Sequence, residues 1–269
     1  MTATDKFLAR LASENACLIT LHDSRGSVPR ENGAWMAVFA AATVGTVGGG
    51  HLELMATAEA RQRLSGRAGE ALLRYALGPA LGQCCGGEVQ LRFESVTALD
   101  IAPLRQRLRV KRYPVALFGG GHVGHALVRV LADLPLQVTW VDSRDEIFPA
   151  DLPTHVRCEH SDPVQAALAP LAPDSRVLIM SFSHAEDLDI VAACLLRQRL
   201  QADLPYVGLI GSRTKWATFS HRLAARGFTA QELAHVTCPI GVAGIAGKEP
   251  EVIAVAVAAQ ILQTLPRCR

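Results

Sequence analysis

Residues 115–124 read Val-Ala-Leu-Phe-Gly-Gly-Gly-His-Val-Gly, a short apolar run that passes directly into a glycine-rich turn. Gly119, Gly121 and Gly124 have the spacing of a dinucleotide-binding fingerprint, in which a strand precedes the turn and a helix follows it. Asp142 comes eighteen residues after Gly124, at the end of the next predicted strand, as the fingerprint requires. The stretch therefore predicts a Rossmann-like fold and makes these four residues candidates for cofactor binding, while the fold alone leaves nucleotide binding open.

The second half of the chain continues this alternation of strands and helices. Further strands are predicted at 136–141, 155–158, 177–182 and 206–210, with helices at 163–168, 186–200 and 215–226, and with a strongly apolar last helix at 251–265. Alternating strands and helices are typical of a parallel sheet with helices on both faces. We expect a doubly wound Rossmann-like domain over residues 113–269.

Arg144 adds a charge close to the acid of the fingerprint. It lies two residues after Asp142, where a cation can meet the 2′-phosphate of a nucleotide. It is also close enough in sequence to pair with Asp145 or Glu146, and the sequence leaves both possibilities open.

His184 follows the predicted 177–182 strand, at the edge of the sheet where ligands of open α/β sheets bind. His184 with Asp187 or Asp189 is a candidate acid–base pair, but capping by Ser183 and ordinary first-turn acids explain the same pattern. The spacing identifies no catalytic residue, and His184 stays a candidate cofactor contact.

The first third of the chain has a different pattern. Strands are predicted at 16–21, 35–39, 43–47, 71–77 and 88–96, and helices at 4–14 and from about residue 50 to 64. These elements predict an α+β domain over residues 1–96, which residues 97–112 connect to the second domain. The whole chain is thus predicted to be an α/β protein, with an N-terminal α+β domain followed by a Rossmann-like doubly wound parallel sheet.

Two loops of the N-terminal domain suit an anion. The loop at 24–31 combines arginines with small residues, a composition that fits an anion site and equally fits an exposed loop. A glycine triplet opens the helix near residue 50, where free backbone N–H groups attract phosphate or carboxylate, although a plain turn fits as well. The polar residues after it are candidate ligand partners or ordinary first-turn residues. The candidates are Arg30, Gly48, Gly49, Gly50, His51 and Glu53.

Residues 82–87 read Gly-Gln-Cys-Cys-Gly-Gly and place two adjacent thiols in a glycine-rich bend. Consecutive Cα atoms lie about 3.8 Å apart, closer than a relaxed disulfide allows, so a bond between Cys84 and Cys85 would be strained and labile. Adjacent side chains of extended backbone point to opposite faces, which disfavours one metal ion held by both. The pair is either buried packing or a thiol that contacts a ligand, and Gln83, Cys84 and Cys85 are candidate cofactor contacts.

Composition narrows the class of protein. Of 269 residues, 49% are apolar and 19% are charged, which is typical of a globular chain with ample core. The formal net charge is only +2 and Lys and Arg are scattered, which argues against a nucleic-acid partner. Seven cysteines at irregular spacing predict neither a disulfide framework nor a zinc site. The N-terminus has no signal-peptide pattern and no apolar run is long enough to span a membrane, so we expect a cytoplasmic protein with reduced thiols.

Several motifs together resemble the XdhC/CoxI family. In chain order they are Gly26 to Arg30, Gly45 to Glu53, Gly82 to Gly87, Phe118 to Gly124, Val141 to Arg144, Tyr206 to Ser212 and Gly247 to Ala254. The resemblance covers nearly the whole chain and keeps the motif order, which makes it specific. It departs at Ser181-Phe182-Ser183-His184, where many relatives have Thr-His after the strand, and this puts the role of His184 in doubt.

The resemblance implies an accessory protein of xanthine dehydrogenase and not a catalyst. Such proteins bind the molybdenum cofactor (molybdopterin), protect it while a partner cysteine desulfurase supplies its terminal sulfur, and deliver it to apo-xanthine dehydrogenase. The alternative is an NAD(P)-dependent oxidoreductase that uses the same fingerprint, and a third reading is an adaptor that binds neither ligand. The apolar last helix favours a homodimer.

Overall fold

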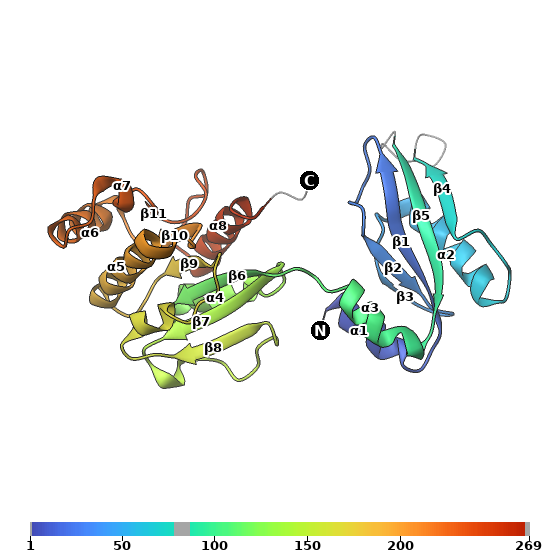
Figure 1. Ribbon diagram of the computed structural model, residues 1–269, viewed down its shortest axis with the longest axis horizontal. Helices are drawn as coiled ribbons and strands as arrows, with labels where there is room; N and C mark the ends of the chain where they lie inside the picture. The colour runs from blue at the N-terminus through green and yellow to red at the C-terminus, as the bar shows by residue number, and fades with distance from the viewer. Residues whose placement is uncertain (1, 78–86, 267–269) are drawn as a thin grey trace. The chain divides into compact units, whose positions relative to one another are not determined.

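Two sheets organise the chain, one in residues 1–109 and one in residues 110–269 (Figure 1). The first sheet has five antiparallel strands and the second has six parallel strands. This computed structural model describes residues 2–77 and 87–266. The predicted fold class is confirmed: a first unit of mixed α and β structure precedes a Rossmann-like unit.

The sheet of the first unit has the strand order β3-β2-β1-β5-β4. Its strands are β1 (Ala16–Arg25), β2 (Trp35–Val38), β3 (Thr43–Gly45), β4 (Leu72–Ala76) and β5 (Glu88–Val96). Its helices are α1 (Ala3–Leu11), α2 (Gly50–Leu64) and α3 (Ile101–Arg107), with the short 3₁₀ turn η2 (Ala98–Asp100).

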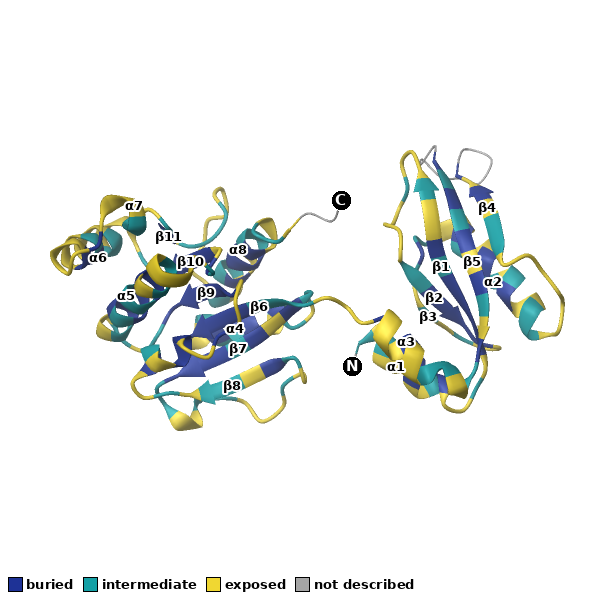
Figure 2. Cartoon of the chain, viewed as in Figure 1, coloured by how far each residue is buried: buried dark blue, intermediate teal, exposed yellow. Residues whose placement is uncertain are grey.

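Helices cover both faces of this sheet because β1 is apolar on both sides. Cys17, Ile19 and Leu21 belong to the core beneath α2, whereas Ala16 and Leu18 belong to the core beneath α1 and α3. Successive residues of a strand point to opposite faces, so the two cores lie on opposite sides of one sheet. Figure 2 shows the buried strands between the partly exposed helices.

The segment 97–112, which we expected to connect the domains, mostly belongs to the first unit. It forms η2 and α3, and Leu104 and Leu108 are buried in one cluster with Phe7 of α1. Apolar residues four positions apart lie on one face of a helix, and here that face finds a hydrophobic partner in α1. The two units divide after Arg109.

The sheet of the second unit has the strand order β11-β10-β9-β6-β7-β8. Its strands are β6 (Tyr113–Phe118), β7 (Leu136–Asp142), β8 (Val156–His160), β9 (Arg176–Ile179), β10 (Tyr206–Leu209) and β11 (Val236–Thr237). Its helices are α4 (His122–Leu131), α5 (His184–Gln201), α6 (Arg213–Ala225), α7 (Ala230–Leu233) and α8 (Pro250–Gln263), with the 3₁₀ turns η3 (Asp145–Ile147) and η4 (Val164–Leu168).

Helices pack on both faces of the parallel sheet, as alternation in the sequence predicts. One core joins the sheet to α4 and α8, and the other joins it to α5, α6 and η4. The chain runs outward in one direction from β6 through β7 to β8, and in the other from β9 to β11. The reversal between β6 and β9 is the topological switch point, where open α/β sheets bind ligands.

Apart from shifts of one or two residues at strand ends, two details of this sheet differ from the sequence prediction. The strand expected at 177–182 ends at Ile179, because the backbone N–H of Ser181 donates to the Asp187 carboxylate (2.9 Å) instead of pairing in the sheet. The two-residue β11 was not expected, since a strand so short shows no periodicity.

Candidate functional site

The glycine turn after β6 is the centre of the candidate site. Gly119 has a φ of +122°, and a Cβ atom there would lie 1.9 Å from the carbonyl oxygen of Met180. A Cβ atom at Gly124 would lie 2.1 Å from the oxygen of Gly119. At Gly121 a Cβ atom would meet no described atom within 4 Å. Packing therefore requires two of the three fingerprint glycines, whereas Gly121 leaves the backbone open to a ligand.

The start of α4 faces this opening. Gly121 is the residue before the helix, and no side chain in the described part of the chain caps the first turn. Free N–H groups at the start of a helix attract anions such as phosphate. The indole N–H of Trp140 donates a hydrogen bond to the carbonyl oxygen of Gly119 (2.9 Å) and so helps to hold the turn in place. This arrangement suits an anionic group placed beside Gly121.

Asp142 is buried at the end of β7, with 1% of its surface exposed. Its Oδ2 accepts hydrogen bonds from the Gly120 N–H (2.5 Å) and from Nη2 of Arg144 (2.9 Å). Its Oδ1 accepts from the backbone N–H (2.9 Å) and from Nε (2.8 Å) of Arg144. Burial alone would raise the pKa of Asp142, but these hydrogen bonds outweigh it and hold the pKa below its ordinary value.

Arg144 pairs with Asp142, not with Asp145 or Glu146 as the sequence also allowed. Its guanidinium carbon lies 4.6 Å from the centre of the Phe182 ring, in cation–π contact. Phe182 follows β9 and is 66% exposed. Arg144 and Phe182 therefore form the outer rim of the glycine turn.

Glu186 bridges the two loops that carry Arg144 and Phe182. One carboxylate oxygen accepts a hydrogen bond from the Ser143 hydroxyl (2.7 Å), and the other accepts from the Phe182 N–H (3.2 Å). The loops after β7 and β9 are thus joined by one side chain in the first turn of α5. The sequence did not single out Glu186 or Phe182, because only the fold brings these two strand ends together.

A second missed pair lies at the same sheet edge. Lys215 of α6 donates to the Asp187 carboxylate (2.6 Å) and to the oxygen of Ile210 (2.9 Å). Both side chains are nearly buried, 11% and 3% exposed. Asp187 also accepts from the Ser181 hydroxyl (2.7 Å). The pair connects the ends of β9 and β10, and no sequence pattern joins residues 28 positions apart.

His184 does not form the acid–base pair that was left open from the sequence. The carboxylate of Asp187 is engaged by Ser181 and Lys215, and that of Asp189 by Arg226, so neither pairs with the imidazole. His184 is exposed at the first residue of α5, and its ring lies edge-on to Phe219 at 6.3 Å. The cap expected from Ser183 is present, because its hydroxyl accepts the Glu186 N–H (3.2 Å).

The glycine triplet of the first unit already holds an anion of its own chain. Oε1 of Glu53 accepts the N–H groups of Val47 (2.9 Å), Gly48 (3.2 Å) and Gly49 (2.9 Å), and also the hydroxyl of Thr46. Burial would raise the pKa of Glu53, but these donors hold the pKa below its ordinary value. The sequence left a ligand site and a plain turn both open here; Glu53 already occupies the N–H groups, which favours the plain turn.

Arg30 lies beside this turn. A Cβ atom at Gly48, whose φ is +136°, would lie 2.4 Å from Cγ of Pro29 and 3.8 Å from Cγ of Arg30. Pro29, Arg30 and their neighbours Glu31, Asn32 and Ala34 line an open hollow of about 400 Å³. His51 and Arg30 are both exposed, so their side chains remain available to a ligand.

Gln83, Cys84 and Cys85 lie outside the described residues. Gly87, where the described chain resumes, lies against the loop that leads to Arg30, since a Cβ atom on Gly87 would lie 2.5 Å from the oxygen of Ser27. Two of the family motifs therefore meet at this loop, one through Gly48 and one through Gly87.

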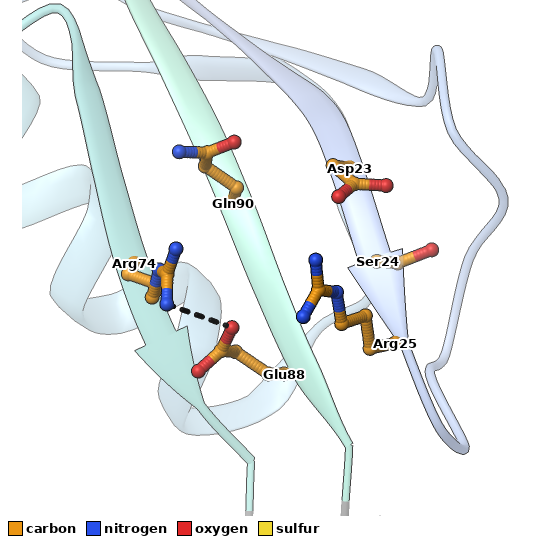
Figure 3. Close-up of a pocket in the computed structure, with 6 residues that line it drawn as sticks. All are labelled: Asp23, Ser24, Arg25, Arg74, Glu88 and Gln90. Carbon is orange, nitrogen blue, oxygen red and sulfur yellow. Dashed lines mark ion pairs between the residues drawn. The ribbon is translucent and has the colours of Figure 1, made fainter.

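A small polar hollow lies on the same sheet, between β1, β5 and β4 (Figure 3). It has a volume of about 20 Å³, room for about one water molecule, and an exposed ion pair of Arg74 and Glu88 (3.5 Å) stands beside it. Exposed pairs of this kind contribute little to stability. The hollow is a solvated patch of sheet and not a candidate ligand site.

Two structural features bear on the classes of function. Over residues 2–77 and 87–266 no group of three or more His, Cys, Asp and Glu side chains is placed to hold a metal ion. In the same residues no helix has the length and apolar character needed to cross a membrane.

Comparison with known proteins follows the division into two units. The model of the XdhC and CoxI family matches residues 9–76, and the model of the XdhC Rossmann domain matches residues 115–261. The uncharacterized protein YqeB of Escherichia coli (strain K12) is 27% identical over 263 residues, which are 95% of this chain and 45% of YqeB. The chain thus spans less than half the length of that relative.

A crystal structure from Bacillus halodurans, described as a xanthine dehydrogenase, has the same fold. Its TM-score is 0.78 at 19% sequence identity, over 98% of this chain and 96% of that one. Both family models match in the expected order, and together they cover most of the sequence. The chain belongs to the XdhC and CoxI family.

Proposed function

We propose that the chain takes part in the maturation of xanthine dehydrogenase by carrying its molybdenum cofactor. In this role it binds molybdopterin, protects it while a cysteine desulfurase supplies the terminal sulfur, and delivers it to the apo-enzyme. Family membership supports the maturation role. The observation that supports binding of the cofactor is the open backbone at Gly121, at the switch point of a Rossmann-like sheet.

The residues at this turn fit one end of such a cofactor. The uncapped first turn of α4 offers N–H donors to a terminal phosphate, and Gly121 leaves room for it. When bound, molybdopterin supplies the molybdenum and the exchangeable sulfur through its own dithiolene. The protein's part is then to bind, orient and shelter the cofactor. Cys84 and Cys85 stay proposed contacts for the sulfur-bearing end.

The alternative role, an NAD(P)-dependent oxidoreductase, is supported by the strand order and the glycine spacing. The state of Asp142 weighs against NAD as its cofactor. In a dinucleotide site this carboxylate accepts a ribose hydroxyl, whereas here it is engaged by Arg144 and Gly120. The homodimer expected from the last helix stays a prediction; α8 exposes Val255 and Leu262 on its outer side.

The test is to identify the small molecule that the protein retains. We would purify the full chain from cells that make the molybdenum cofactor, and then analyse the released ligand by mass spectrometry and by the fluorescence of oxidised pterin. Pterin in near-stoichiometric amount is the expected result. A nicotinamide nucleotide would favour the oxidoreductase, and an empty protein that also fails to activate apo-xanthine dehydrogenase would refute the carrier role.

A further inference from the structure

The four hydrogen bonds on Asp142 leave no acceptor position for a ligand. An ionised carboxylate has about four lone-pair sites, and each oxygen of Asp142 already accepts two donors. A ribose diol that approached this side chain would have to displace the guanidinium of Arg144 first.

Arg144 is held in place from two sides. It donates Nε and Nη2 to the two oxygens of Asp142, a bidentate pair whose planar fork Lys cannot reproduce. Its opposite contact is the ring of Phe182, whose backbone is anchored through Glu186 to Ser143. Because Nη2 and the Gly120 N–H share Oδ2, the guanidinium lies directly beside the glycine turn.

We infer that Arg144 determines ligand specificity at this crevice by excluding ligands that present a free ribose diol. The guanidinium takes the place of the diol on Asp142, while the opening at Gly121 stays accessible to a phosphate. The accepted ligand is therefore one that places a phosphate beside Gly121 and presents no free ribose diol to Asp142. For the proposed function, on which this step rests, that means molybdopterin itself and not a dinucleotide form of the cofactor.

The exclusion is tested without any molybdenum cofactor, by titrating NAD⁺ into the purified full chain in a calorimeter. The wild-type protein should bind NAD⁺ weakly. Arg144→Ala frees Asp142 for the ribose diol and should tighten binding about ten- to hundredfold, the worth of one hydrogen bond to a charged group. Arg157→Ala, an exposed arginine on β8, is the matched control and should leave NAD⁺ binding unchanged.

A second substitution separates this role from a merely structural one. In the double variant Asp142→Asn/Arg144→Ala the gain should disappear, because the carboxylate that accepts the diol is gone. Arg144→Lys tests the same point if Arg144→Ala fails to fold by circular dichroism, since Lys cannot span both oxygens. Tight NAD⁺ binding by the wild-type protein, or no gain in a folded Arg144 variant, would overturn the inference.

The ligand retained from cofactor-producing cells distinguishes this inference from the carrier role. Retention of molybdopterin in its phosphate-monoester form supports both. Retention of a dinucleotide form overturns the exclusion by Arg144 and leaves the carrier role standing. If no pterin is retained and the protein also fails to activate apo-xanthine dehydrogenase, the carrier role fails, whereas the NAD⁺ titration of the Arg144 variants still decides the exclusion.

Discussion

Gly121→Asp should separate the stability of the second unit from its ability to hold an anion. Gly121 has φ of −74° and ψ of −177°, a conformation that any residue adopts, and a Cβ atom there meets nothing within 4 Å. The aspartate therefore fits without strain. Its carboxylate can accept the free N–H groups of the first turn of α4, as a helix N-cap does.

The expected change in stability is small and favourable. Replacing Gly by Asp at an N-cap contributes a few tenths of a kcal/mol, and a negative charge at the helix start adds about 0.3–1 kcal/mol. For a unit of this size, about 1 kcal/mol raises Tm by roughly 2–4 °C. Thermal unfolding of the Gly121→Asp protein should thus occur at the same temperature or slightly higher.

The expected change in ligand binding has the opposite sign and is larger. The new carboxylate occupies the N–H groups and repels a phosphate. A hydrogen bond to a charged group contributes about 1.5–3 kcal/mol, so loss of two such bonds weakens binding by at least about a hundredfold.

The assay measures retained pterin per protein after purification, together with Tm from circular dichroism. Gly121→Ser caps the helix without adding a charge and should lose less ligand, and Ala217→Asp places the same charge on the exposed side of α6 as a control. Full pterin retention in a folded Gly121→Asp protein would show that no phosphate binds at this turn.

Three further predictions concern contacts that stabilise each unit from within. Glu53→Gln should cost about 2–3 kcal/mol of the first unit's stability at pH 7, because a neutral amide oxygen accepts more weakly from the N–H groups of the glycine turn. Since folding lowers the pKa of Glu53, this stabilisation is present above the unfolded-state pKa and is lost as the pH falls through the folded-state pKa. An acid-unfolding curve that is the same for the wild-type and Glu53→Gln proteins would contradict the prediction. Gly119→Ala should destabilise the second unit by about 3 kcal/mol or more, because the new Cβ atom collides with the Met180 carbonyl oxygen and the residue is held at positive φ. Urea denaturation measures the change in the free energy of unfolding, and a decrease of less than about 1 kcal/mol would argue against this turn geometry. Lys215→Met should lower the stability of the second unit by about 3–5 kcal/mol, because it removes the cation paired with the buried Asp187 carboxylate. Adding Asp187→Asn to the same chain should restore much of that stability, and a double variant as unstable as Lys215→Met alone would contradict this explanation.

Local sequence determined the element types and most of their positions. The run before Gly119 is apolar and ends in a turn that needs glycine at Gly119 and Gly124, so β6, the turn and α4 follow the pattern that the residues predict. The same holds for β5, where alternation over Glu88–Val96 predicts the observed bounds. Family membership was likewise visible in the motifs, because each is a short stretch whose order along the chain needs no structure.

Only the tertiary structure decided what the polar residues of these motifs do. Glu53 accepts hydrogen bonds from the N–H groups of its own glycine turn. The carboxylate of Asp142 is paired with the guanidinium of Arg144. Lys215 found Asp187 because parallel strands end at one edge of the sheet, which no spacing in the sequence encodes. A polar side chain forms hydrogen bonds with the donors and acceptors that the tertiary structure places nearest to it. Which groups those are depends on distance in the folded protein and not on separation along the sequence.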